Sequence, residues 1–119
     1  MKKTLILGAS SNPLRFAYLS TEKLVRYKHE VVLIGQKEDE VLGLKIQKGQ
    51  PRIENIDTIT LYLNSKNQEQ YYDYILSLNP KRIIFNPGTE NPVLAEMAEA
   101  KGIEALEGCT LVMLGSGQY

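Results

Sequence analysis

The sequence predicts a single α/β domain, spanning residues 1–119, that is built on a doubly wound parallel sheet. Its length is typical of one domain, and 43% of its residues are hydrophobic, which is enough to form a core. Five short apolar runs alternate with segments of helical periodicity. Because each parallel crossover needs a helix to return the chain, this alternation favours helices on both faces of the sheet.

The five apolar runs are the expected strands, and they cover residues 4–7, 31–34, 58–63, 82–85 and 103–106. Gly8 and Gly35 directly follow the first two runs, and the turn Asn86-Pro87-Gly88 follows the fourth. Short, continuous apolar runs of this kind are typical of parallel strands that are buried on both faces.

Three segments have apolar residues at helical spacing and are the expected helices: residues 14–27, 67–78 and 91–100. Pro13 suits the first turn of the first helix. The apolar face of that helix is expected to comprise Leu14, Ala17, Tyr18, Leu24 and Val25. Residues 36–55 contain two glycines and a proline, which favours a loop or a short strand over a helix.

Numbered along the chain, the five strands are expected to lie in the order 3-2-1-4-5, as in Rossmann-like folds. In open sheets of this class, ligands bind beyond the carboxyl ends of the strands, where the winding changes direction. We therefore expect the crevice between the first and fourth strands. Loops 8–13 and 86–90 should face each other across it, and residues 35–37 should flank it.

The charge and cysteine content exclude several classes of protein. Fourteen basic and fourteen acidic side chains cancel, without a long block of one sign, which argues against a general nucleic-acid binder or a membrane-surface protein. The one cysteine, Cys109, has no partner for an internal disulfide. No segment has the length and hydrophobicity of a membrane span, and no secretory leader is evident, so we expect a cytoplasmic protein.

The loop that begins at Gly8 leads directly into the first expected helix. Unpaired backbone N–H groups and the positive end of a helix dipole converge at such a position, which favours phosphate binding. Gly8 permits a tight turn, and Arg15 adds a positive charge. Further hydrogen-bond donors are the side chains of Ser10, Ser11 and Asn12. Simple helix capping with a solvated arginine explains the same residues, and the pattern alone leaves both interpretations open.

The Gly-x-Gly-x-x-Gly fingerprint of dinucleotide-binding sites is absent, because Ser10 and Pro13 occupy the positions of its second and third glycines. The acidic residue that normally binds the ribose of NAD is absent too, since Gly35 and Gln36 end the second run and Lys37 follows. This end of the expected sheet suits a phosphorylated ribose or no ribose contact at all.

Several short motifs follow one another along nearly the whole chain: Gly8-Ala9-Ser10, Pro13-x-Arg15, Gly43, Ile56-Asp57, Pro87-Gly88, and Gly102-Ile103 leading to Cys109. Taken together, their order and spacing resemble the small stand-alone CoA-binding proteins, whose fold is similar to the nucleotide domain of the succinyl-CoA synthetase alpha subunit. The resemblance implies a Rossmann-like fold and a site for coenzyme A or acyl-CoA.

The same resemblance implies roles for the three loops named above. The first loop would hold the pyrophosphate or the ribose phosphate of the cofactor, through Gly8, Ala9, Ser10, Asn12 and Arg15. The turn after the second strand would border the adenosine, through Gly35, Gln36 and Lys37. The opposite wall would be lined by Asn86, Pro87 and Gly88.

Other reactive side chains have simpler structural explanations. His29 precedes the second strand, away from the expected crevice, and is interpreted as a surface or helix-end residue. Cys109 follows the last strand without a histidine partner, so burial is the favoured interpretation. Glu90 could contact a ligand hydroxyl or act as a base, although an early helix position favoured by the dipole also explains it. No cluster of His, Cys and carboxylates has the spacing of a metal site.

Because no catalytic constellation is visible, the leading hypothesis is a binding module for coenzyme A or acyl-CoA that performs no bond chemistry alone. A small NAD(P)-dependent or nucleotide-dependent enzyme that uses Cys109 or Glu90 is one alternative. Another is an interaction protein with a vestigial pocket, which would form a homodimer or bind a partner through its tyrosine-bearing helix. No nucleic-acid or membrane partner is expected.

Overall fold

The strands form where the apolar runs lie. The computed structural model describes residues 1–119, and its central strands are β1 (Thr4–Leu7), β2 (Val31–Ile34), β5 (Thr58–Leu61) and β6 (Arg82–Phe85), followed in the chain by β7 (Glu104–Glu107). Almost every residue of the four central strands is buried, as their continuous apolar composition predicts. The third expected strand is shorter than predicted, because it ends at Leu61 and leaves residues 62–63 in the following loop.

Two further strands occupy the segment for which a loop or a short strand was the expectation. β3 (Asp39–Val41) and β4 (Leu44–Gln47) form an antiparallel hairpin, and β4 pairs in parallel with β2. The two residues between them, Leu42 and Gly43, have φ angles of 53° and 79°, as a two-residue hairpin turn requires. Such hairpin turns usually contain Asn-Gly or Asp-Gly, and leucine is rare at a positive φ. The pair Leu42-Gly43 therefore gives no turn signal in the sequence.

The observed strand order, β3-β4-β2-β1-β5-β6-β7, corrects the predicted one. The sheet has seven strands instead of about five, and only the β3–β4 pair is antiparallel. β5 pairs with β1 and not with β2, whose outer side is taken by β4. The order 3-2-1-4-5 is therefore wrong in one respect: the third expected strand, β5, lies between β1 and β6 and not outside β2. As a result, the winding changes direction between β1 and β5, next to the place where the crevice was expected.

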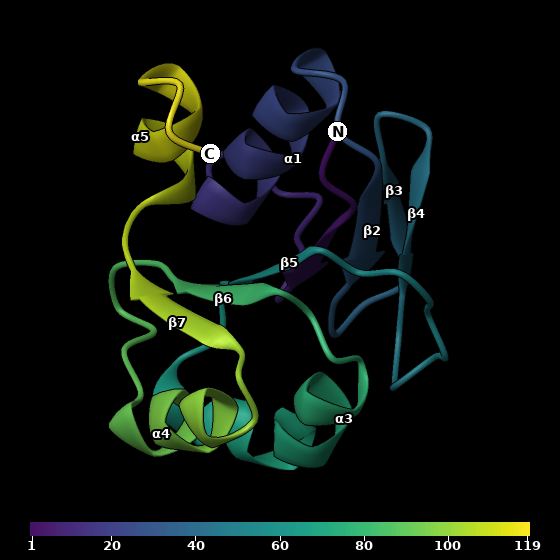
Figure 1. The fold of residues 1–119 in the computed structure, drawn as a ribbon. Helices are drawn as coiled ribbons and strands as arrows, with labels where there is room; N and C mark the ends of the chain where they lie inside the picture. Colours follow the sequence, from purple (N-terminus) through teal and green to yellow (C-terminus); the bar gives the residue numbers. More distant parts are fainter.

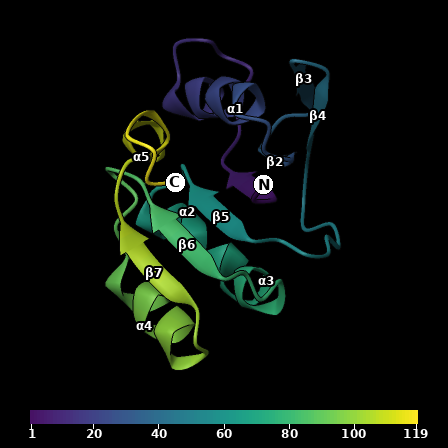
Figure 2. The same cartoon turned by 45° about the horizontal axis from the view of Figure 1, so that its top comes forward.

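Helices cover both faces of the sheet, as the alternation of apolar runs and helical segments predicts. Figure 1 shows α1 (Phe16–Arg26) and α5 (Thr110–Gly115) on one face, with α3 (Tyr72–Ser77) and α4 (Pro92–Ala100) on the other. Two hydrophobic clusters match these layers: Ile6 packs with α1 and α5, whereas Leu5 and Leu7 pack with α3 and α4. The turned view in Figure 2 separates the same layers. None of the helices is both long and apolar enough to traverse a bilayer.

The first helix begins two residues later than predicted. Asn12 accepts hydrogen bonds from Leu14 N through its side chain and from Arg15 N through its main-chain oxygen, so residues 12–15 form a turn. Pro13 lies in this turn and not in the first turn of a helix. Leu14 is 88% exposed for the same reason, and its predicted place in the core is wrong.

The expected helix over residues 67–78 is divided into three pieces. α2 (Ser65–Gln68) is followed by a 3₁₀ turn, η1 (Glu69–Tyr71), and then by α3. The third expected helix, by contrast, matches α4 almost residue for residue, because Asn91 caps it through a bond from Leu94 N and Pro92 follows at its first position.

Gly35 allows the end of β2 to touch the loop after β1, and its replacement tests this packing. A Cβ at Gly35 would lie 2.5 Å from the oxygen of Ala9. Gly35→Ala is therefore expected to lower the free energy of unfolding by about 1–3 kcal/mol through overpacking. Gly108→Ala is the matched control, since its Cβ would approach no atom closer than 3.6 Å, and a change within about 0.5 kcal/mol is expected. Urea denaturation measures both, and equal effects would contradict the prediction.

The stability of the fold should depend on the protonation of His29. Burial, followed by the positive charges of the amino terminus, Lys2 and Arg82, lowers the pKa of His29 below its ordinary value of 6.5. Its Nδ1 also accepts a hydrogen bond from Lys2 N at 3.0 Å. Protonation is thus costlier in the folded chain than in the unfolded chain, so stability is complete above pH 6.5 and falls as the pH drops below it.

In urea denaturation at several pH values, the wild-type chain is expected to lose stability as the pH falls below about 6.5, the ordinary pKa of histidine. His29→Asn should remove most of that loss. Parallel pH profiles for the two chains would show that another group is responsible.

Candidate functional site

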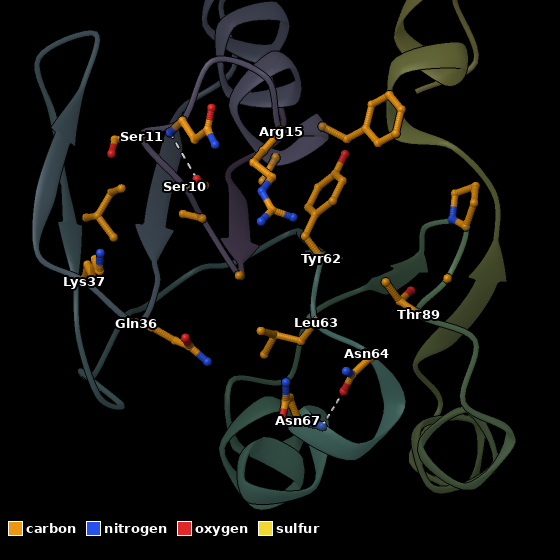
Figure 3. A pocket seen from close by; sticks show the side chains of 18 residues that line it. Ser10, Ser11, Arg15, Gln36, Lys37, Tyr62, Leu63, Asn64, Asn67 and Thr89 are labelled. Atoms are coloured by element: carbon orange, nitrogen blue, oxygen red, sulfur yellow. Dashed lines mark hydrogen bonds between the residues drawn. The ribbon is translucent and has the colours of Figure 1, made fainter.

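A cavity of about 820 Å³ lies at the carboxyl ends of β1, β2, β5 and β6. Three of the four loops around it are the ones that the sequence analysis identified, 8–13, 35–37 and 86–90. They contribute residues 8–12, 36–37 and 87–89 to the lining, and residues 15–17 add the start of α1. The fourth is the loop after β5, which begins at Tyr62. Figure 3 shows the labelled side chains of these loops surrounding one open space. The cavity therefore occupies the place where an open α/β sheet binds its ligands.

The loop after β1 presents backbone N–H groups that have no partner in the protein. The N–H groups of Gly8 and Ala9 both donate to the oxygen of Ile34, at 2.9 Å each, and so belong to the sheet. The next N–H groups that make no hydrogen bond are those of Ser10, Ser11, Phe16 and Ala17, all of which line the cavity. Those of Phe16 and Ala17 are at the start of α1, where the helix dipole is positive. An anion placed here could accept hydrogen bonds both from the amides of the loop and from those at the start of α1.

Two cations add to this positive potential. The guanidinium of Arg15 extends into the middle of the cavity in Figure 3 and takes part in no ion pair. Lys37 lies at one side of the cavity, after β2, and is equally unpaired. The 18 lining residues include no aspartate and no glutamate. The charge of the cavity is therefore positive, although the whole chain is neutral.

One carboxylate outside the lining bonds to a lining residue. Asp39, on β3, accepts hydrogen bonds from Ser11 Oγ at 2.6 Å and from Glu40 N at 2.8 Å. These bonds, with the Ser11 hydroxyl contributing most and the charge of Lys37 adding to them, lower the pKa of Asp39. The Ser11 contact also ties the β3–β4 hairpin to the loop after β1, so the two loops at this side of the cavity are held together.

Nine of the eleven residues proposed from the sequence line the cavity, and two lie behind it. Gly35 is buried at the end of β2, where its lack of a side chain lets the oxygen of Ala9 approach. Asn86 is 2% exposed, and its amide donates to Thr60 Oγ1 at 2.7 Å and to Leu61 O at 2.8 Å while its Oδ1 accepts from Thr110 N. Both residues hold the ends of these loops in place and do not line the cavity.

Seven lining residues lie outside the loops identified from the sequence and were not proposed: Tyr62, Leu63, Asn64, Asn67, Phe16, Ala17 and Ile46. The first three follow β5, which was expected at the far side of β2 and therefore away from the crevice. Tyr62 bonds through its hydroxyl to Ser20 of α1. Burial raises the pKa of Tyr62, which keeps the hydroxyl protonated. Asn64 caps α2 by accepting from Asn67 N at 2.8 Å. The asparagine that follows the third apolar run was the available signal for this loop.

The three reactive residues considered from the sequence do not line the cavity. His29 lies at the opposite, amino end of the sheet, in edge-to-face contact with Tyr119. Cys109 is half-buried before the first turn of α5. Glu90 accepts a hydrogen bond from Gly88 N at 3.0 Å and so stabilises the turn after β6. What the cavity offers is hydrogen-bond donors and positive charge, a combination suited to holding an anionic ligand.

The fold recurs in solved structures. An uncharacterized protein whose crystal structure is known has 55% sequence identity and a TM-score of 0.98, with 100% of this chain and 98% of that chain covered. A conserved hypothetical protein from Pyrococcus furiosus has 25% identity and a TM-score of 0.82 over 94% of this chain and 98% of its own. A hypothetical protein from Pyrococcus horikoshii OT3 has 22% identity and a TM-score of 0.87, with 98% of this chain and 83% of that chain covered.

None of the proteins with curated descriptions matches the chain. A family model, by contrast, matches residues 2–115, which is nearly the whole chain, and it is described as a CoA binding domain. This match includes every motif on which the resemblance rests, from Gly8-Ala9-Ser10 to Cys109. The resemblance is confirmed, and the chain belongs to the CoA-binding domain family.

Proposed function

We propose that this protein binds coenzyme A or an acyl-CoA and performs no bond chemistry alone. One observation carries the proposal: unpaired amides at the start of α1 and the unpaired Arg15 converge on a cavity that has no carboxylate in its lining. Coenzyme A is an anionic ligand with a diphosphate and a ribose phosphate, and membership of the CoA-binding family supports the choice of this ligand.

The residues present fit the charged part of that cofactor. The amides of Ser10 and Ser11, with those at the start of α1 and the Arg15 guanidinium, would hold the diphosphate. Gln36 and Lys37 would border the adenosine, where the Lys37 ammonium can pair with a ribose phosphate. Pro87 and Gly88 would line the opposite wall. The cavity volume of about 820 Å³ lies within the range that is usual for small-molecule and cofactor sites.

The same residues disfavour an NAD site. The second and third glycines of the dinucleotide fingerprint are replaced by Ser10 and Pro13, and Pro13 lies in a turn ahead of α1. The loop after β2 offers Gln36 and Lys37 to the cavity and no acidic residue that would accept a ribose hydroxyl. A ligand with phosphates at both ends of its nucleotide half matches this distribution of charge better than NAD does.

Isothermal titration of the purified chain with coenzyme A tests the proposed function. Saturable binding with a Kd below about 1 mM is expected, and NADP should compete at least about tenfold more weakly. A correctly folded chain that releases no heat with millimolar coenzyme A would contradict the proposal. Tighter binding of NADP would instead favour the nucleotide-dependent enzyme.

Removal of the Arg15 side chain tests the diphosphate contact. The main-chain oxygen of Arg15 accepts bonds from Tyr18 N and Leu19 N, so Arg15→Ala keeps the start of α1 and removes only the charge. Binding of coenzyme A is expected to weaken by roughly 1.5–3 kcal/mol, about tenfold to a hundredfold. The control is Arg26→Ala in the last turn of α1, which lies outside the cavity and should leave affinity unchanged. Equal affinities for the two variants would exclude a charge-assisted contact at Arg15.

A further inference from the structure

Gln68 is a buried polar residue whose side chain joins two walls of the cavity. It ends the short helix α2 and has no exposed surface. Its amide nitrogen donates to the main-chain oxygen of Leu63, in the loop after β5, and to that of Thr89, in the loop after β6, at 2.8 Å each. Leu63 and Thr89 both line the cavity. One side chain thus fixes the spacing between two loops that come from different crossovers of the sheet.

The orientation of the Gln68 amide is set by Asn91. The Oδ1 of Asn91 accepts from Leu94 N at 3.1 Å as the cap of α4, so its Nδ2 must be the donor on the other side. That Nδ2 donates to Gln68 Oε1 at 2.9 Å and to Tyr72 Oη at 2.8 Å. With its oxygen engaged by Asn91, Gln68 can turn only its nitrogen toward the two loop oxygens. The cap of α4 therefore determines how the cavity wall is held.

This arrangement is more than the satisfaction of a buried polar group. The main-chain oxygens of Leu63 and Thr89 accept no other hydrogen bond in the protein, so the loops depend on Gln68 for this contact. A leucine or methionine could fill the same volume and would need no hydrogen-bond partners, unlike the buried amide of Gln68. The polar residue instead adds a directional connection between two segments that no strand pairing joins at this point, because β5 and β6 have already ended.

The wall that Gln68 joins, formed by the loops after β5 and β6, lies across the cavity from the loop after β2. In Figure 3, Asn64 and Thr89 lie across the space from Lys37 and Ser11, with Arg15 between them. If the phosphates occupy the cationic side, the remainder of an elongated ligand has to extend along the wall that Gln68 holds. The nucleotide part and the remainder of the ligand therefore depend on different residues.

We propose that Gln68, oriented by Asn91, is a positioning residue that sets the width of the cavity for the part of the ligand beyond the phosphates. This inference rests on the proposed function. It predicts that Gln68 tunes affinity selectively: binding of the complete cofactor should depend on it, whereas binding of the nucleotide portion alone should not.

Calorimetric titration of Gln68→Met with coenzyme A and with adenosine 3′,5′-bisphosphate tests the proposal. Affinity for coenzyme A is expected to fall about tenfold, and affinity for the bisphosphate should change less than about twofold. The matched control is Gln70→Met, the same chemical change at an exposed position outside the cavity, which should alter neither affinity. Equal losses for both ligands, or no loss for coenzyme A, would overturn the role of Gln68.

Amide hydrogen exchange on the unliganded chain separates this proposal from the function on which it rests. Gln68→Met should speed exchange in the loops 62–64 and 87–90 together while leaving the loop 8–15 unchanged. If the wild-type chain binds neither ligand, the proposed function fails, and this exchange pattern still decides whether Gln68 connects the loops. Faster exchange throughout the chain, or in one of the two loops only, would contradict the proposal that Gln68 connects them.

Asn91→Asp provides a second variant in case Gln68→Met does not fold. It keeps the oxygen that caps α4 and removes the amide that orients Gln68. The same selective loss of affinity for coenzyme A is expected, and an unchanged affinity ratio between the two ligands would count against the orienting role.

Discussion

The backbone contact between the loop after β1 and the end of β2 determines where the free N–H groups of the cavity lie. Gly8 and Ala9 donate their N–H groups to one oxygen, that of Ile34, and the Ala9 oxygen lies so close to Gly35 that a side chain there would collide with it. This contact uses the first two amides of the loop in the sheet, and the next two, those of Ser10 and Ser11, make no hydrogen bond. The concentration of donors in the cavity is therefore a consequence of strand packing, and not of a separate binding motif.

Much of the fold follows from local patterns in the sequence. The five apolar runs all form strands, and helices cover both faces, because burial on two sides requires continuous apolar composition. The exception is the hairpin over residues 39–47. Its turn uses Leu42 at positive φ, and its strands carry several exposed charges, so neither composition nor turn residues indicate it. Its absence from the prediction placed the third expected strand on the wrong side of β1.

The candidate site was predictable to the extent that it follows from strand ends. The loops after β1, β2 and β6 were identified because each begins at the end of an apolar run, and nine of their proposed residues line the cavity. The loop after β5 was not identified, because it reaches the cavity only through the pairing of β5 with β1, which are far apart in the sequence. Gln68 could not be found from periodicity either, since its burial reflects hydrogen bonds to two loops and to Asn91, none of which leaves a local pattern.

The two outermost strands of the sheet share a chemical property. Exposed carboxylates occupy β3, at Asp39 and Glu40, and β7, at Glu104 and Glu107. Edge strands have unpaired backbone groups that can recruit another chain, and charged side chains are a common protection against this. Two copies meeting edge to edge would bring like charges together in every combination of β3 and β7. The charges at both edges therefore disfavour growth of the open sheet by addition of strands from another copy.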